Sequence, residues 1–147
     1  MMNRCLAACL TFCVAMSAAR AADPVSQTFE GSVQTLAKVL EKQGIPADKD
    51  VTGVALVTKD GTVYTIAKEK VSRLLFVDPV FENRTVRLTA KILPGSQILK
   101  VEKVQTVKAG KVYDVDYWCE NCQLAWSAPG ACQCCGGDTV FREREAK

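Results

Sequence analysis

Residues 84–93 read RTVRLTAKIL and carry the clearest strand pattern of the chain. Its apolar side chains recur at every second position, and polar side chains stand between them; the apolar set is Val86, Leu88, Ala90 and Ile92. A period of two predicts a β-strand with one face on a core and the other on solvent. A half-buried strand of this kind is typical of antiparallel sheets.

The segment after this strand continues the pattern. Pro94-Gly95 suits the central positions of a type II turn. Residues 97–107 alternate again, but the alternation slips by one residue, which predicts a β-bulge near Glu102-Lys103. Ala109-Gly110 then predicts another turn.

Residues 111–119 alternate once more, with aromatic and aliphatic side chains on one face and Asp114 and Asp116 on the other. Glu143 and Glu145 have the same spacing near the C-terminus. We interpret these carboxylates as solvated faces and not as acid/base pairs, because alternation along a strand is sufficient to explain them.

The segments before residue 84 also favour strands. Residues 51–58 and 62–67 flank Asp60-Gly61, and Asp-Gly between alternating runs is a strong hairpin signal. Residues 73–77 are apolar and predict a further strand or a tight connector.

Residues 23–50 permit two interpretations. Ser32 can cap a helix whose apolar side chains recur at i, i+3 and i+4 and which ends at Gly44. Alternatively, residues 28–33 form a first strand and only a short helix follows. We favour the strand followed by the helix.

Five or six short strands joined by glycine turns predict a mainly β fold, a small antiparallel OB-like barrel or curled sheet with one short helix. Over residues 28–117 the order of a glycine-containing strand, an Asp-Gly hairpin and a Pro-Gly meander resembles an OB-type barrel. That resemblance implies a surface for oligonucleotides or sugars. The aromatic side chains here are expected to be core or rim; they are Tyr64, Phe76 and Phe81.

The N-terminus has the pattern of an export signal. A short basic start is followed by an apolar run and by Ala19-Arg20-Ala21, so residues 1–21 are expected to be a removable signal peptide. Without them the chain has 17 basic and 16 acidic residues, interleaved along the sequence. We therefore expect a periplasmic or extracellular protein with no stable membrane insertion after cleavage and no affinity for nucleic acid.

The most specific functional pattern in the sequence is formed by four cysteines near the C-terminus. Cys119 and Cys122 form one C-x-x-C pair, and Cys132 and Cys135 form another. Two such pairs can complete a tetrahedral four-sulfur site, for which zinc is the expected ion and iron the alternative. The chain has no histidine, which excludes His-based catalysis and mixed Cys/His sites.

These residues resemble a known family. The two pairs, with Ala128-Pro129 before the second pair and Phe141 after it, are similar to a rubredoxin-like or short zinc-ribbon knuckle. The resemblance covers about residues 116–142 and implies a four-cysteine Zn or Fe site. The first pair departs from the pattern, because Gln123 stands where the second has Gly136. The whole chain also resembles small exported bacterial proteins of unknown function.

Two other interpretations of the cysteines remain open. An exported protein can form disulfides, although the five cysteines that follow residues 1–21 cannot all pair within one chain. Cys119 and Cys122 can also be catalytic thiols, but no long helix is predicted after them to activate the first thiol. Cys134 is left over from the metal site and is interpreted as a small buried filler, or else as a substitute ligand or redox-sensitive thiol.

We therefore divide the chain into a signal peptide (1–21), an OB-like β domain (22–116) and a tetrathiolate metal-knuckle tail (117–147). The predicted function is a binding or interaction module for an unknown protein or small ligand, and an enzyme is not favoured. The alternative is a redox or electron-transfer protein that uses iron or the thiols.

Overall fold

The computed structural model describes residues 23–147, so the predicted signal peptide lies outside the described residues. The strands are β1 (Gln27–Thr35), β2 (Val54–Thr58), β3 (Val63–Ile66), β4 (Thr85–Ile92), β5 (Ile98–Lys108), β6 (Lys111–Cys119), β7 (Leu124–Trp126) and β8 (Val140–Glu145). The helices of the described residues are α1 (Leu36–Lys42), α2 (Leu74–Val77) and the 3-10 turn η1 (Pro79–Phe81). The prediction of a mainly β chain is confirmed.

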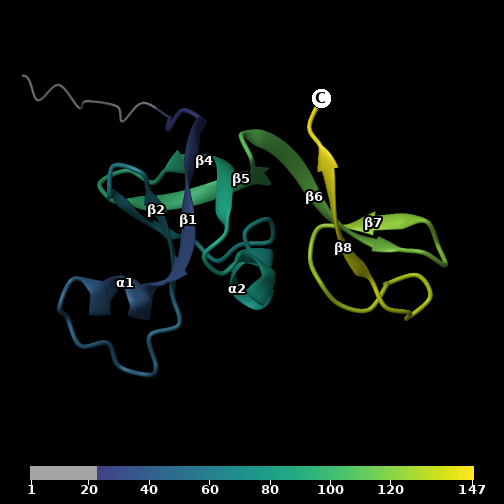
Figure 1. Cartoon of the computed structure of the whole chain (residues 1–147), viewed down its shortest axis with the longest axis horizontal. Helices are drawn as coiled ribbons and strands as arrows, with labels where there is room; N and C mark the ends of the chain where they lie inside the picture. Colours follow the sequence, from purple (N-terminus) through teal and green to yellow (C-terminus); the bar gives the residue numbers. More distant parts are fainter. Residues whose placement is uncertain (1–22) are drawn as a thin grey trace, which may run out of the picture.

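Five strands form a closed ring. Figure 1 labels β1, β2, β4 and β5 of this ring. β1 pairs antiparallel with β2 on one side and with β4 on the other. β2 continues to β3, and β4 continues to β5, again antiparallel. The parallel pairing of β3 with β5 then completes the circuit.

Gly31 lies where β1 is paired on both sides, opposite Thr58 of β2 and Val86 of β4. A Cβ atom at this position would lie only 2.4 Å from the carbonyl oxygen of Val57. Real side chains do not approach backbone atoms so closely, so the strand needs a glycine here. Gly31 thus marks a close approach of the β1 and β2 backbones.

We expect Gly31→Ala to lower the free energy of unfolding by about 2–3 kcal/mol, because the added methyl group must displace backbone. The matched control is Gly61→Ala. Gly61 has a φ of +84° but open space around its Cβ position. The control should therefore lose only about 1 kcal/mol of backbone preference. Urea unfolding measures both, and equal losses would contradict the steric explanation.

Most of the local predictions are confirmed. Thr89 pairs with Lys103 and Ala90 pairs with Val101, so Glu102 is the extra residue of a β-bulge. β1 is followed by a short helix, as favoured. Thr35 caps α1, because its side-chain oxygen accepts a hydrogen bond from the Lys38 backbone N–H at 3.4 Å.

Within residues 73–77, for which a strand or tight connector was expected, Leu74–Val77 form the single helical turn of α2. The turn buries Leu74 and Leu75 together against the core, which an alternating strand cannot do with adjacent residues. No helix within residues 23–147 is both long and apolar enough to cross a membrane.

The core is filled from every strand of the ring. Its fully buried side chains include Phe81 of η1, Leu56 of β2, Leu88 of β4 and Leu99 of β5. The placement of Phe81 in the core agrees with the expectation for the aromatic side chains. Tyr64 and Phe76 are partly buried and pack against the same cluster.

β6 carries the chain out of the ring (Figure 1). Its first half pairs with β5, its second half pairs with β7, and β8 pairs along its other edge. The predicted boundary between residues 116 and 117 lies inside this strand. The tail is thus a continuation of the sheet that begins in the ring.

Aromatic packing and a hydrogen bond help to hold the tail against the ring. Phe141 of β8 meets Phe81 edge to face, with ring centroids 5.6 Å apart, and meets Tyr117 at 5.7 Å. The buried Tyr117 hydroxyl donates a hydrogen bond of 2.6 Å to Asp78 Oδ2, next to η1. The position of the cysteines relative to the ring is therefore fixed through β6 and β8.

Candidate metal centre

The four predicted cysteines meet at the end of β6. Cys119 is the last residue of this strand, and Cys122 lies in the turn to β7. Cys132 and Cys135 lie in the loop between β7 and β8. Their four Sγ atoms all lie within 4.8 Å of one another, and those of Cys119 and Cys135 are 3.6 Å apart. Four cysteines so placed can hold a metal ion, since tetrahedral bonds of 2.3 Å separate sulfurs by about 3.8 Å.

The two pairs have the same backbone shape. The Gln123 N–H donates to the Cys119 carbonyl and the Gly136 N–H donates to the Cys132 carbonyl, both at 2.8 Å. Both donor residues have positive φ, +53° for Gln123 and +72° for Gly136. The sequence departure at Gln123 therefore does not change the fold of the first pair. It places a non-glycine residue in a conformation that favours glycine.

Backbone N–H groups point at the first sulfur of each pair. Those of Cys135 and Cys134 lower the pKa of Cys132 to about 6 and outweigh the opposing effect of burial. The N–H of Cys122 lowers the pKa of Cys119. Burial and the thiols of Cys132 and Cys135 outweigh this effect, so the pKa of Cys119 is raised overall. Such N–H⋯S bonds stabilise thiolate, the form that binds metals.

The cluster has a buried side and an exposed side. Cys119 and Cys132 are 1% and 2% exposed, Cys122 is partly buried, and Cys135 is exposed. The fifth cysteine, Cys134, is also exposed, so the interpretation of Cys134 as a buried filler is wrong. Its thiol lies beside Cys122, where contacts with the Cys135 and Cys134 thiols raise the pKa of Cys122.

An ion cluster supports β6 just before Cys119. Asp116, 6% exposed, accepts hydrogen bonds from Arg142 Nε at 2.8 Å and Nη2 at 3.0 Å. Arg144 Nη2 lies 2.8 Å from the same carboxylate, and the Arg142 guanidinium lies 4.0 Å from the centre of the Trp118 ring. The prediction of a solvated face is therefore wrong for Asp116.

Glu143 is likewise withdrawn from solvent, with its side chain 14% exposed. It accepts hydrogen bonds from Arg84 at 2.9 Å, from Thr106 at 2.6 Å and from Lys108. The solvated-face prediction is wrong here too, because the β6–β8 pairing places this carboxylate beside β5 and the start of β4. Glu143 thereby joins the tail to the ring.

This arrangement predicts a dependence of stability on pH. Burial raises the pKa of Glu143, but Lys108, Thr106 and Arg84 together lower it below the ordinary glutamate value of 4.5. A lowered folded-state pKa contributes stability above pH 4.5 that is lost as the pH falls through the folded value. We expect Glu143→Gln to have a lower melting temperature than the wild type at pH 7. On acidification, the melting temperature of the variant should fall by less than that of the wild type.

The measurement is the difference in melting temperature between wild type and Glu143→Gln from pH 7 down to pH 3. Acid would also protonate any cysteine that binds a metal, but this would affect both proteins alike and cancel in the difference. A difference that stays constant over this range would contradict the role given to Glu143.

The spacing of the cysteines predicted the four thiols of this site. It did not predict the ion cluster that Asp116 forms with Arg142 and Arg144. A signal was present, since Arg142 and Arg144 alternate in the same way as Asp114 and Asp116. Opposite charges of equal spacing suit facing strands.

A comparison of the chain with protein-family models, with curated proteins and with solved structures finds no match, so the expected resemblance to exported bacterial proteins has no support from relatives. The geometry of the four cysteines is compatible with a zinc-knuckle-like site, and this conclusion rests on the positions of their sulfurs and not on any relative.

Proposed function

We propose that residues 22–147 are an exported, non-enzymatic binding module whose C-terminal tail is stabilised by a structural metal ion. The observation that supports this most strongly is the convergence of the Cys119, Cys122, Cys132 and Cys135 sulfurs within 4.8 Å of one another. Four thiolates fill a tetrahedral coordination sphere and leave no open position for substrate. Such a site stabilises structure and does not perform hydrolysis.

Zinc is the proposed ion. It is the common occupant of closed tetrathiolate sites and has no redox chemistry of its own. The exposure of Cys135, with Cys122 partly buried, favours a second candidate, an iron tetrathiolate that exchanges electrons through this edge. The two candidates share the same ligands and differ in the ion.

For the ring, we propose an OB-like barrel as the scaffold. The support is its pairing order. β2 pairs antiparallel with both β1 and β3, and β4 pairs antiparallel with β5. The antiparallel β1–β4 pair and the parallel β3–β5 pair join these two sets of strands. That order suits a five-stranded Greek-key barrel. The segment α2–η1 connects β3 to β4, and the tail extends from β5 through β6.

The proposed location is the periplasm or the cell exterior, on the basis of the signal-like residues 1–21. The proposed partner is a protein or a small ligand. Nucleic acid is not proposed, because most lysines and arginines of residues 23–147 face carboxylates and form no continuous basic track.

The test is to measure metal per chain and free thiols on protein purified without added metal. About one zinc per chain, with all thiols recovered after denaturation in chelator, is the expected result. One iron per chain, with absorption of visible light, would instead support the second candidate, an iron tetrathiolate that exchanges electrons. No metal together with a single free thiol would contradict both, and the tail would then be held by disulfides.

A further inference from the structure

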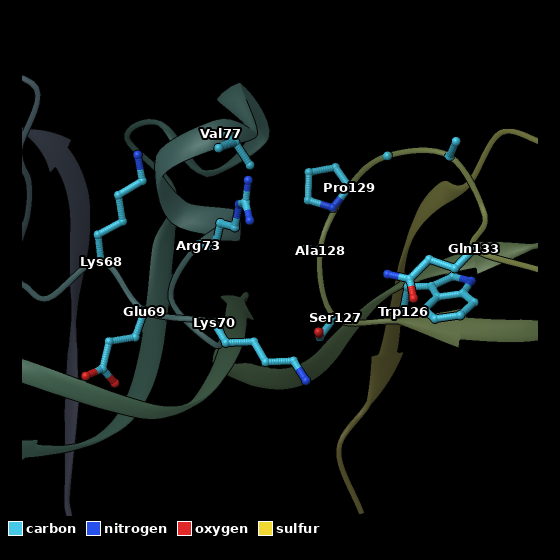
Figure 2. Close-up of a pocket in the computed structure, with 12 residues that line it drawn as sticks. Lys68, Glu69, Lys70, Arg73, Val77, Trp126, Ser127, Ala128, Pro129 and Gln133 are labelled. Carbon is cyan, nitrogen blue, oxygen red and sulfur yellow. The ribbon is translucent and has the colours of Figure 1, made fainter. Parts of the chain in front are cut away.

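A cavity of about 930 Å³ lies between the ring and the metal-knuckle tail (Figure 2). One wall is the connection from β3 through α2, with Lys68, Lys70 and Arg73. The other wall is the loop that leads from β7 to the second cysteine pair, with Ser127 and Gln133. Neither cavity wall belongs to the ion clusters described above.

The first wall concentrates cations that have no carboxylate partner. Of the 17 lysines and arginines within residues 23–147, 11 lie within salt-bridge distance of a carboxylate. Among the described residues, Lys68, Lys70 and Arg73 are three of the six that do not, and all three line this one cavity. An excess of positive charge in a hollow focuses the field on an anion.

The acidic residue of this wall does not neutralise them. Glu69 lies 3.9 Å from Lys100, on the neighbouring strand β5. In Figure 2 its carboxylate turns away from Lys70 and Arg73, while the Lys70 ammonium extends toward Ser127. The alternation along residues 68–70 thus separates the acid from the bases that face the hollow.

Both walls are held in place. On the ring side, the buried Ser72 hydroxyl donates to the Ala67 carbonyl at 2.6 Å and accepts from the Glu69 N–H at 2.9 Å. On the tail side, the Thr139 hydroxyl donates to the Gly130 carbonyl and the Cys132 N–H donates to the Gly137 carbonyl, both at 2.7 Å. A wall fixed before binding loses little freedom when a ligand arrives.

We propose that this cavity binds a small organic polyanion that carries at least two carboxylate or phosphate groups. Arg73 offers a planar fork for one oxyanion, and Lys68 and Lys70 offer point charges for a second. Ser127 and Gln133 can hydrogen-bond the neutral part from the opposite wall. The volume lies within the range of small-molecule sites. This assigns a ligand class to the binding role proposed above, and it does not depend on which metal fills the cluster.

The test is calorimetric titration of the purified protein with citrate and with pyrophosphate, with acetate at matched ionic strength as the monoanion control. Binding of citrate or pyrophosphate well above acetate is the expected result. The tighter of the two identifies carboxylate or phosphate as the preferred group. No binding above acetate would overturn the proposal. Binding only of poly-glutamate would also overturn it, in favour of an acidic protein partner.

The variant K70A/R73A should weaken binding of the preferred anion at least about tenfold, the size expected for lost charge-assisted hydrogen bonds. The matched control is K49A/K147A, which removes the same charge at two unpaired cations outside the cavity. An equal loss in both variants would overturn the site. Metal content is measured in the same samples. A sample without metal contradicts the proposed metal site, whereas the absence of anion binding contradicts the proposed anion site.

Discussion

Cys132→Ser is expected to abolish stoichiometric metal binding and to lower the free energy of unfolding by about 3 kcal/mol or more. Cys132 is 2% exposed and is one of the four sulfurs that converge within 4.8 Å. Serine nearly preserves the volume but supplies no thiolate, so the proposed ion would lose a ligand on the buried side. For a domain of this size the loss corresponds to roughly 10 °C or more in melting temperature.

The matched control for this prediction is Cys134→Ser, two residues away in the same loop. Cys134 is exposed and lies outside the set of four, so its replacement should leave metal content and melting temperature unchanged. Metal analysis and thermal melting of both variants are sufficient. Full metal in Cys132→Ser, or equal loss in Cys134→Ser, would contradict the assignment of the ligands.

Asp116→Ala is expected to lower the free energy of unfolding by about 2–4 kcal/mol, the second largest effect. Its carboxylate is 6% exposed and is contacted by both Arg142 and Arg144. Removing one partner of a buried ion cluster leaves charges uncompensated, which costs far more than losing a surface pair. The pairing of β6 with β8 weakens, and with it the support of Cys119 at the end of β6.

Asp114→Ala is the control on the same strand and the same face. The Asp114 side chain is 37% exposed and lies 2.8 Å from Lys103, itself 53% exposed. A pair so open to solvent contributes less than about 1 kcal/mol. Urea unfolding of the two variants measures the contrast. Similar losses would mean that the burial of Asp116 has no energetic consequence.

The regular part of the fold could be predicted from the sequence because alternation and glycine turns are local signals. Within residues 84–93, Thr85–Ile92 form β4 with its apolar face buried, and the slip predicted in the next strand is the bulge at Glu102. The closure of the ring could not be predicted in the same way. Thr65 and Ile98 pair in parallel across a long stretch of chain, and no local pattern encodes that contact.

The four cysteines of the candidate site were predictable because their spacing itself carries the chemistry. The surroundings were not, since alternation shows that Asp116 and Glu143 face one side of a strand but not what covers that side. The cavity was missed for a related reason. Arg73 and Gln133 are brought together only by the path of β6 and the tail.

X-ray absorption at the metal edge of the purified protein is the most direct test of the four-sulfur site, because it counts the atoms bound to the ion. We expect about four sulfur neighbours at about 2.3 Å and no nitrogen or oxygen shell, with zinc as the absorbing metal. A first shell with two sulfurs and several oxygens, or protein that carries no stoichiometric metal, would contradict a tetrathiolate site at Cys119, Cys122, Cys132 and Cys135.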